Sequence, residues 1–443
     1  MRSYDVVIVG GGPAGRTIVH TLHEHHAGLS IAVIKDEAIN VNRCAVPYGI
    51  NAEDPIEKFQ IPNKLVSDFG AELIVESVER LDPKGKTVTL ASGETIGYDK
   101  LVLATGARPF VPPIEGIESE NITFVRSLAD LERLRQLAAK SREVVILGGG
   151  YIGVEVAVVL KDMGLSVSLV EMQPTILGGT AEPELTEVLL AAMMEHGIHL
   201  HTERRVVKFL DNGAVELNNG SEVPGDFVVV AAGVRPDISL AEAAGLNVSK
   251  HGVVVDDHMR SVSHPDIYAC GDCAQGISFF TGLPVPSEFG TNAVFMGRVV
   301  AANIMGQDRS FPGVINACVS AVFDWSFGTA GLTEAAAIAA GQDVVCGFSQ
   351  VLDRYPMMHD VSDVHTKLVF ARGNGRLLGG SVVRKGLGTA LAVDFISFAC
   401  QMRATIDDLL AFQYATHPEL AAKPSDDAFL FAAKDADRKR RQE

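Results

Sequence analysis

The chain has 443 residues, of which 47% are hydrophobic and 21% are charged, a composition typical of a soluble globular protein. This length exceeds what one hydrophobic core usually serves, so two or three domains are expected. The 55 acidic residues outnumber the 38 basic ones and give a net charge of -17, which disfavours binding to nucleic acid and to anionic membranes because like charges repel.

No membrane segment or export signal is expected. The first residues show no basic leader followed by an apolar segment and a cleavage site. The most apolar stretch, residues 144–160, is short for a bilayer span and contains Glu155. The six cysteines are scattered over a large chain, which is typical of reduced thiols in the cytoplasm. We therefore expect a cytoplasmic protein without a membrane anchor.

A glycine-rich loop follows the first apolar run. Residues 5–9 are expected to form a buried parallel strand, and a helix begins soon after them. Between them the pattern Gly-x-Gly-x-x-Gly permits a tight turn, close approach of a pyrophosphate, and packing of helix on strand. Strand, loop and helix in this order predict a dinucleotide site. The predicted contacts are Gly10, Gly12, Pro13, Ala14 and Gly15.

The second strand, residues 30–34, is expected to lead to an acid that accepts the adenosine ribose hydroxyls. Lys35 comes first, and Asp36 and Glu37 follow it. Asp36 lies 21 residues after Gly15, which is the expected spacing, and is the predicted ribose acid. The alternative is that Asp36 and Glu37 belong to a solvated loop.

One cysteine stands out in the next stretch, residues 40–50. Cys44 follows Arg43 directly and precedes Pro47-Tyr48. A neighbouring cation and a helix N-terminus favour the thiolate, the reactive form of cysteine. Cys44 lies eight residues beyond Asp36, close to where a dinucleotide would carry its reactive ring. We predict that Cys44 is catalytic and that Arg43 lies beside the cofactor. The alternative for Cys44 is a small buried hydrophobe.

A further strand-like run, residues 98–103, ends in Ala104-Thr105-Gly106. Small side chains there let a chain pass close to a bound cofactor, so these three residues are predicted contacts. A similar run closes the next unit and contains Gly233, which is a predicted contact for the same reason.

A second copy of the glycine pattern begins after the apolar run 143–147 and opens another helix. Two complete patterns in one chain imply two nucleotide sites. The predicted contacts of the second site are Gly148, Gly150, Tyr151, Ile152, Gly153 and Glu155.

The second ribose acid is predicted to be Glu171, which lies 18 residues past Gly153 at the end of a strand-like run. The alternative is an ordinary surface carboxylate. Met172-Gln173-Pro174 follows Glu171 without an arginine to meet a 2′-phosphate. NADH is therefore favoured over NADPH.

Residues 264–274 combine a strand with a Gly271-Asp272 turn. The spacing Cys270-x-x-Cys273 can indicate a metal or redox pair, but the sequence contains no second ligand pair, so no metal site is expected. Gly271 and Asp272 are predicted contacts of an extended cofactor chain. The helix expected at 290–303 would present its positive N-terminus, near Asn292, to a ring that becomes anionic on reduction; the alternative is an ordinary buried helix.

From about Val322 the pattern changes to alternating strands followed by helices, which predicts a third, α+β domain. Tyr355, Tyr414 and His417 are candidates to give protons to a leaving thiolate, although each residue taken singly is more often a surface or packing residue. The charged end, residues 434–443, is expected to be a solvated tail.

Together these motifs resemble the flavin-dependent pyridine nucleotide-disulfide oxidoreductases. The stretch Cys44-Ala45-Val46-Pro47-Tyr48 resembles their single-cysteine branch, which contains coenzyme A-disulfide reductases, NADH oxidases and peroxidases, and persulfide reductases. The resemblance implies that Cys44 is the redox centre and that the chain forms a homodimer. It implies FAD at Gly10, Gly12, Gly15, Thr105, Gly106 and Asp272, and NADH at Gly148, Gly150, Gly153 and Glu171.

The expected fold class is α/β, with two Rossmann-like nucleotide-binding domains, for FAD and NAD, and a C-terminal α+β dimerisation domain. The FAD-binding domain is expected to be discontinuous, at 1–112 and 251–321. The NAD-binding domain is expected at 113–250 and the dimerisation domain at 322–443.

The sequence departs from the resembling branch at three places. Pro13 stands where oxidases and peroxidases carry a histidine, which weakens a peroxide role. Arg43 stands where coenzyme A-disulfide reductases usually have asparagine, which puts coenzyme A in doubt. His417-Pro418 replaces the prolines that usually follow the tyrosine corresponding to Tyr414.

The expected function is electron transfer from NADH through FAD and Cys44 to a low-molecular-weight disulfide, persulfide or polysulfide, such as coenzyme A-disulfide. No second cysteine lies nearby in sequence, so the oxidised form of Cys44 must be a mixed disulfide, a persulfide or a sulfenic acid. The alternatives, in descending order, are an NADH oxidase or peroxidase, an electron-transfer flavoprotein that serves a ferredoxin-like partner, and a non-enzymatic nucleotide-sensing module.

Overall fold

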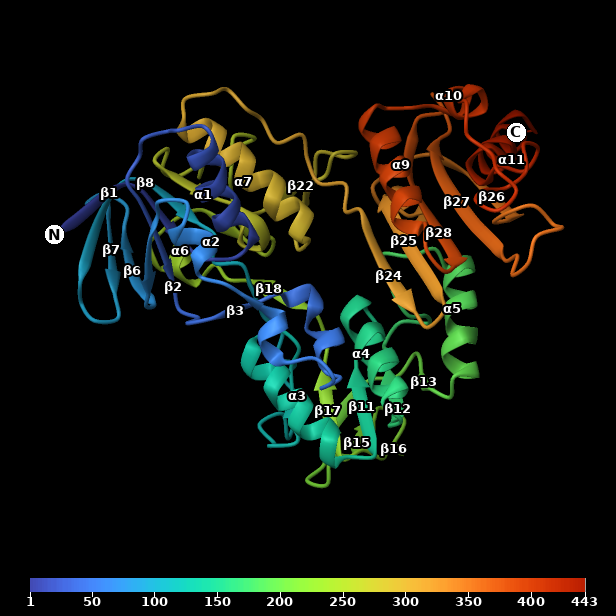
Figure 1. Ribbon diagram of the computed structural model, residues 1–443, viewed down its shortest axis with the longest axis horizontal. Helices are drawn as coiled ribbons and strands as arrows, with labels where there is room; N and C mark the ends of the chain where they lie inside the picture. The colour runs from blue at the N-terminus through green and yellow to red at the C-terminus, as the bar shows by residue number, and fades with distance from the viewer. Residues whose placement is uncertain (443) are drawn as a thin grey trace. The chain divides into compact units, whose positions relative to one another are not determined.

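The computed structural model describes residues 1–442, which divide into two compact units. The first contains residues 1–110, 126–131 and 233–314, and the second contains 111–125, 132–232 and the chain from 315 on (Figure 1). The predicted domain boundaries stay a prediction, but segments 126–131 and 233–250 lie with the first nucleotide motif in this division. Within residues 1–442, no helix combines the length and apolarity needed to cross a membrane.

The first unit is built on a seven-stranded sheet of order β5-β2-β1-β8-β7-β6, in which β21 also pairs with β8. Neighbouring strands are parallel among β5, β2, β1, β8 and β21. Strand β7 runs antiparallel to both of its neighbours, β8 and β6. The strands are β1 (Arg2–Val9), β2 (Ile31–Lys35), β5 (Glu72–Val75), β6 (Val78–Asp82), β7 (Thr87–Leu90), β8 (Thr95–Leu103) and β21 (Ile267–Ala269). Continuous burial of residues 6–9 and 31–35 is typical of parallel strands covered on both faces.

The remaining elements of the first unit are short strands and four helices. The helices are α1 (Pro13–Glu24), α2 (Lys64–Ser67), α6 (Ser239–Ala243) and α7 (Gly290–Ile304). The strands pair two by two: β3 (Asn40–Val41) with β4 (Gln60–Ile61), β9 (Ala107–Pro109) with β18 (Val234–Pro236), β19 (Val248–Ser249) with β20 (Gly252–Val253), and β22 (Gly276–Ile277) with β23 (Pro284–Val285).

Two late segments complete the first nucleotide fold. The N–H of Cys270, just after β21, donates to the carbonyl of Leu103 at 3.0 Å, so Gly271 and Asp272 lie at the same sheet edge as residues 104–106. Helix α7 packs against α1, and a Cβ at Gly297 would lie 2.8 Å from the carbonyl oxygen of Ala14. The small residue therefore permits the close packing of the two helices.

The second unit repeats the strand, loop and helix arrangement. Its parallel sheet has the order β10-β17-β11-β12-β13, and a separate antiparallel sheet has the order β14-β15-β16. The strands are β10 (Ile122–Thr123), β11 (Glu143–Leu147), β12 (Ser166–Val170), β13 (His199–His201), β14 (Val206–Phe209), β15 (Val215–Leu217), β16 (Glu222–Val223) and β17 (Phe227–Val230). The helices are α3 (Leu128–Lys140), which begins in segment 126–131, α4 (Tyr151–Asp162) and α5 (Pro183–Glu195).

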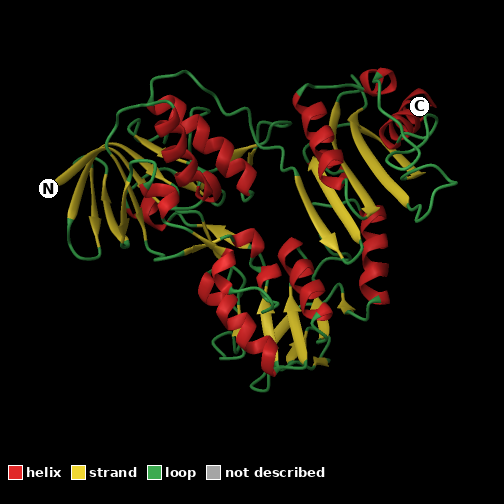
Figure 2. Ribbon diagram, viewed as in Figure 1, coloured by secondary structure: helices red, strands yellow, loops and turns green. Residues whose placement is uncertain are grey.

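The C-terminal part of the second unit is an antiparallel sheet of order β24-β25-β28-β27-β26 with helices packed on it (Figure 2). Its strands are β24 (Cys318–Val322), β25 (Trp325–Gly331), β26 (Val344–Leu352), β27 (Asp363–Ala371) and β28 (Leu377–Lys385). Its helices are α8 (Glu334–Ala339), α9 (Thr389–Gln401), α10 (Ile406–Ala411) and α11 (Ala428–Gln442). The α/β class, with an α+β domain at the end of the chain, is confirmed.

The prediction of a solvated C-terminal tail is wrong for residues 434–442, which belong to α11. Ala432, Ala433 and Ala436 are fully buried. A Cβ at Gly347 in β26 would lie 1.8 Å from the carbonyl oxygen of Ala432, so the helix lies directly on the strand. The prediction relied on the many charged residues of this segment, which lie on the helix surface. The buried face of α11 consists of alanines, which give only a weak apolar pattern in the sequence. Residue 443 of the predicted tail lies outside the described residues.

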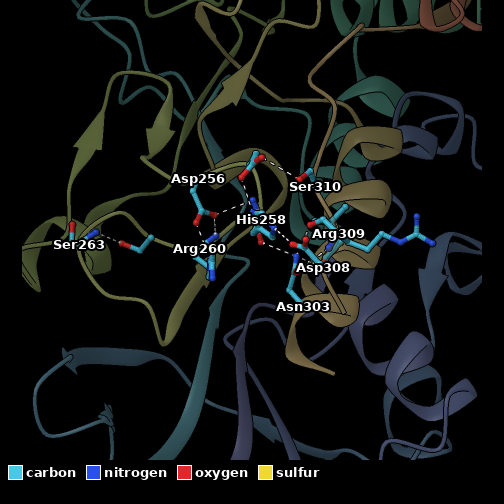
Figure 3. Close-up of polar contacts among 11 residues, drawn as sticks. Asp256, His258, Arg260, Ser263, Asn303, Asp308, Arg309 and Ser310 are labelled. Carbon is cyan, nitrogen blue, oxygen red and sulfur yellow. Dashed lines mark hydrogen bonds and ion pairs between the residues drawn. The ribbon is translucent and has the colours of Figure 1, made fainter. Parts of the chain in front are cut away.

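A polar cluster joins the loop 256–260 to the segment after α7 (Figure 3). The ring nitrogens of His258 contact Asp257 at 2.7 Å and Asp308 at 2.6 Å. The Asn303 side chain donates to the carbonyls of His258, at 3.2 Å, and Arg309, at 2.8 Å. Asp308 first, and then Asp257, raise the pKa of His258 by hydrogen bonding. The cluster is therefore held together best when the imidazole is protonated.

This linkage gives a pH-dependent stability. Because the pKa of His258 is raised in the folded state, its stabilisation is present below the unfolded pKa of 6.5 and is lost as pH rises through the raised value. We expect His258→Gln to lower Tm more at about pH 6 than at about pH 9. Thermal unfolding at the two pH values measures this, with His359→Gln, at an exposed histidine, as the control. An equal loss of Tm at both pH values would contradict the assignment.

Candidate active site

The first glycine loop forms an open cradle at the carboxyl end of β1. Gly10 has a φ of +118°, and a Cβ there would lie 2.1 Å from the carbonyl oxygen of Ala104. A Cβ at Gly15 would lie 2.2 Å from the carbonyl oxygen of Gly10, so both positions require glycine. At Gly12, directly before α1, a Cβ would meet no atom within 4 Å other than those of its chain neighbours. Backbone N–H groups at such a helix N-terminus bind phosphate oxygens, and the cradle therefore fits a dinucleotide.

The loop lines an open cavity. Most of the predicted first-site contacts line it: Gly10, Gly12, Pro13, Ala14, Asp36, Arg43, Ala104, Thr105, Gly106, Gly271 and Asp272. Asp36 is exposed, whereas Lys35 before it is buried and lines the same cavity. The structure thus brings these separate segments together, and the role of Asp36 as the ribose acid stays a prediction.

Two arginines flank the turn at Gly106. A Cβ at Gly106 would lie 3.4 Å from Nη1 of Arg43 and 3.7 Å from Nη2 of Arg126. Arg126 pairs with Asp272 at 3.3 Å, and burial, with the nearby charge of Arg43, lowers the pKa of Arg126. The sequence interpretation missed Arg126, because no motif surrounds it and it lies far from the glycine loop in sequence. Two cations at this edge favour an anionic ligand.

Cys44 is the one exposed cysteine among the six, all of which lie in the described part of the chain. It sits in a short 3₁₀ turn, Arg43–Ala45, which the buried residues Val46 and Pro47 anchor. Arg43, its neighbour, lines the dinucleotide cavity and lies 3.5 Å from Glu37. The alternative of a small buried hydrophobe is therefore wrong for Cys44.

The other thiols are in environments that suppress the thiolate. Burial raises the pKa of Cys270 and Cys273, and the Cys273 thiol donates to the carbonyl of Leu103 at 3.3 Å. Burial also raises the pKa of Cys318 to about 11 and those of Cys346 and Cys400 to about 12. Since the thiolate is the nucleophile, Cys44 is the thiol that can react with a molecule from solution.

The second glycine loop forms a cradle of the same kind. Gly148 has a φ of +110°, and its Cβ would lie 2.5 Å from the carbonyl oxygen of Ala231. A Cβ at Gly153 would lie 1.9 Å from the carbonyl oxygen of Gly148, while the position at Gly150 is open. Glu171 accepts hydrogen bonds from the N–H groups of Gly149, at 2.6 Å, and Gln173, at 2.7 Å. Glu171 is thus fixed against the loop, and its role as the ribose acid stays a prediction.

Two side chains of α4 are held by the C-terminal sheet. The thiol of Cys318 donates to the hydroxyl of Tyr151 at 2.7 Å, and the hydroxyl of Ser320 donates to Glu155 at 2.9 Å. Cys318 and Ser320 both belong to β24. Burial raises the pKa of the Tyr151 phenol, so it stays protonated near neutral pH. Side chains at the start of α4 are therefore linked to residues of the last domain at Tyr151 and Glu155.

Three further residues that the sequence analysis predicted as cofactor contacts lie on three different segments of the structure. Ile152 is 38% exposed beside the second cradle. Gly233 belongs to the first unit, where its carbonyl accepts from the N–H of Phe110 at 2.9 Å. Asn292 lies in the first turn of α7. Their roles stay predictions.

Tyr355, Tyr414 and His417 lie on two neighbouring loops of the second unit. The N–H of Tyr355 donates to the carbonyl of Pro418 at 3.2 Å, which joins the loops. The Tyr414 hydroxyl donates to the carbonyl of Pro424 at 2.6 Å, and Nδ1 of His417 accepts from the N–H of Glu419 at 3.2 Å. Cys44 belongs to the first unit, so the structure does not bring these residues and Cys44 together within one unit. Their catalytic role stays a prediction.

Comparison with known proteins gives matches along the whole chain. Individual relatives include the NADH oxidase of Methanocaldococcus jannaschii, 32% identical over 94% of this chain and 95% of that protein. The coenzyme A-dependent NAD(P)H sulfur oxidoreductase of Pyrococcus abyssi is 29% identical over 85% of this chain and 86% of that protein. The solved structures include an NAD-dependent persulfide reductase from A. fulgidus, with a TM-score of 0.92 and 30% identity over 99% of this chain and 84% of that chain. A water-forming NADH oxidase from Lactobacillus brevis has a TM-score of 0.93 and 25% identity, over 100% of this chain and 99% of that chain.

Two family models account for most of the sequence. The model described as pyridine nucleotide-disulphide oxidoreductase matches residues 4–295, which hold both glycine cradles and Cys44. The dimerisation-domain model of the same family matches residues 318–428. Since the first model alone covers well over half of the chain, this protein belongs to the pyridine nucleotide-disulphide oxidoreductase family.

Proposed function

We propose that this protein is an FAD-dependent enzyme that transfers electrons from NADH through Cys44 to a low-molecular-weight disulfide, persulfide or polysulfide, a class that includes coenzyme A derivatives. The observation that carries the proposal is the exposure of Cys44 beside the dinucleotide cavity, while the other thiols are buried or half-buried. The persulfide reductase and the sulfur oxidoreductase among the relatives support a sulfur compound as acceptor.

FAD is assigned to the first cradle and NADH to the second. Backbone N–H groups at Gly12 and the start of α1 would bind the FAD pyrophosphate, with Arg43 and Arg126 offsetting its negative charge. Bound FAD supplies two-electron chemistry, and the protein positions it. At the second cradle, the fixed carboxylate of Glu171 would accept the ribose hydroxyls and repel a 2′-phosphate, so NADH is preferred over NADPH.

The chemistry assigned to Cys44 is thiol–disulfide exchange. Its thiolate attacks one sulfur of the substrate, forms a mixed disulfide and releases the other sulfur as a thiolate. Two electrons and one proton then release the bound half as a thiol and restore the Cys44 thiolate. Within the first unit the remaining thiols, Cys270 and Cys273, are fully buried. An internal disulfide with Cys44 is therefore not part of the proposed cycle.

A second candidate function is an NADH oxidase or peroxidase that works through a sulfenic acid on Cys44. The identity to the oxidase of M. jannaschii and the likeness to the oxidase of L. brevis favour it. Pro13 argues against it, since the resembling oxidases carry a histidine there. Oxygen uptake with NADH alone separates the two functions, because an oxidase consumes oxygen rapidly without a sulfur substrate.

The proposal includes a homodimer in the cytoplasm. The match to a dimerisation domain supports two copies, and α9 and its ends expose a row of apolar side chains. These are Leu387, Leu391, Phe398 and Met402, each at least 63% exposed. In such a dimer Tyr355, Tyr414 and His417 of one copy are candidates to donate protons at Cys44 of the other. All six cysteines are free thiols, which supports a reducing compartment.

Replacing the thiol tests the proposed redox centre. We expect Cys44→Ser to retain FAD but to lose disulfide or persulfide reduction on the order of 10³-fold or more, because the nucleophile is gone. The measurement is NADH consumption with coenzyme A-disulfide and with a persulfide. Cys346→Ser, at a thiol with a strongly raised pKa, is the control and should keep its activity. Unchanged turnover in Cys44→Ser would refute the proposal.

The two open glycine positions allow the two cofactor sites to be tested separately. Gly12 and Gly150 have φ values of -72° and -73°, so an aspartate fits the backbone while its carboxylate repels a pyrophosphate. We expect Gly12→Asp to lose FAD, and Gly150→Asp to keep FAD but resist bleaching by NADH. Flavin absorbance after gel filtration and an anaerobic NADH titration measure both. Retention of FAD by Gly12→Asp would place the flavin elsewhere.

A charge on α9 tests the dimer. We expect Phe398→Glu to convert the dimer largely to monomer, since burying an unpaired carboxylate in an apolar interface costs several kcal/mol. Light scattering coupled to gel filtration gives the mass of each species. Met194→Glu, at a methionine of α5 that is 64% exposed, is the control and should leave the mass unchanged. A Phe398→Glu protein that remains a dimer would exclude α9 as the interface.

A further inference from the structure

The residues around the two glycine loops correspond one to one in their hydrogen bonds and strand register. In the first, the N–H of Gly10 donates to the carbonyl of Ile34 at 2.8 Å, and in the second, the N–H of Gly148 donates to the carbonyl of Val170 at 2.9 Å. The strand registers pair Val9 with Ile34 and Leu147 with Val170. The residues that follow, Lys35 and Glu171, therefore occupy equivalent positions.

The side chains at these two positions contact equivalent glycines. A Cβ at Gly149 would lie 3.1 Å from Oε2 of Glu171, and a Cβ at Gly11 would lie 2.8 Å from Cδ of Lys35. Glu171 is the predicted ribose acid of the second site. In the first site a lysine, only 5% exposed, takes this place, and Asp36 is one residue further on and exposed.

The ammonium group of Lys35 is held by neutral oxygens. Its Nζ lies 2.6 Å from Oδ1 of Asn40 and 2.7 Å from Oδ1 of Asn63, and a third contact to the carbonyl of Ala38 is long, at 3.4 Å. An ammonium has three N–H donors, so two are engaged at short distance and the third only weakly. Lys35 also lines the dinucleotide cavity. One donor can therefore turn to a hydroxyl of a bound ligand.

Further side-chain contacts lead from Asn40, a partner of Lys35, to Arg43, the residue before Cys44. Nδ2 of Asn40 donates to Glu37 at 2.7 Å, and Glu37 pairs with Arg43 at 3.5 Å. Arg43 directly precedes Cys44. Glu37 lies two residues beyond the position that corresponds to Glu171, so Lys35 and the adjacent, exposed Asp36 are the candidates for the ribose contact.

We propose that Lys35 replaces the ribose acid of the first site and binds the adenosine ribose of FAD as a hydrogen-bond donor. The inference rests on the proposed assignment of FAD to this cradle. It reverses the direction of the usual hydrogen bond, since the ribose hydroxyl oxygens accept from the ammonium group. Specificity for FAD at this end then comes from Lys35, not from Asp36.

The test compares two flavins on full-length protein stripped of its cofactor. FMN lacks the adenosine half, so a lost ribose contact weakens binding of FAD but not of FMN. We expect Lys35→Met to weaken FAD about tenfold or more, as for a hydrogen bond to a charged group, with FMN unchanged. Asp68→Asn, at an exposed carboxylate outside the cavity lining, is the control and should bind FAD as the wild type does. Asp36→Asn tests the rival ribose assignment, and we expect it to keep its affinity for FAD. Quenching of flavin fluorescence gives both dissociation constants.

Three outcomes would overturn the inference. These are a Lys35→Met protein that binds FAD normally, an Asp36→Asn protein that binds FAD much more weakly, and an equal loss of FAD and FMN, which would give Lys35 a structural role alone. If Lys35→Met does not fold, the dissociation constants of FAD and FMN are measured on Lys35→Gln instead, and their ratio is compared with that of the wild type. Failure of the FAD assignment itself is recognised separately, because Gly12→Asp would then retain FAD.

Discussion

The close approach of the backbone at Gly10 and Gly148 to a neighbouring segment, at the ends of β1 and β11, is the constraint on which both glycine loops depend. Gly10 and Gly148 have positive φ values, and any Cβ there would lie within 2.5 Å of a carbonyl carried by a neighbouring segment. Glycine at these positions lets the loop turn sharply, so that α1 and α4 begin directly above the sheet edge. Each helix N-terminus then presents backbone N–H groups to the space beside its own glycine loop.

Much of this architecture could be predicted because it rests on local patterns. The glycine spacing and the apolar runs before it depend on neighbouring residues, and the structure has the expected strand, loop and helix at both glycine patterns. The role of Glu171 as a ribose acid stays a prediction. Arg126 and α11 could not be predicted, since the first is brought to Gly106 by long-range folding and the second hides its buried alanines among charged residues. At Lys35 the spacing rule favoured Asp36, but strand register, which only the structure gives, decides which side chain faces the loop.

Burial, more than sequence context, separates the reactive thiol from the other five. Cys270 and Cys273 have a spacing typical of redox pairs, yet both are enclosed and their pKa values are raised. Cys44, by contrast, is exposed and stands on a short 3₁₀ turn. Because Cys44 is the one exposed cysteine of the six, all of them in residues 1–442, the electron acceptor is set by which molecules can reach Cys44 from solution.

The contacts of β24 with Tyr151 and Glu155 bear on how far the parts of this chain can be exchanged. A hybrid protein that takes everything from residue 315 onward from a relative would keep the glycine loop of the second site intact. Helix α4 would nevertheless lose two polar contacts, at Tyr151 and Glu155, unless the incoming strand offers donors at the positions of Cys318 and Ser320. The C-terminal domain is therefore tied to helix α4 by side-chain contacts, and we expect substitutions in β24 and in α4 to accompany one another.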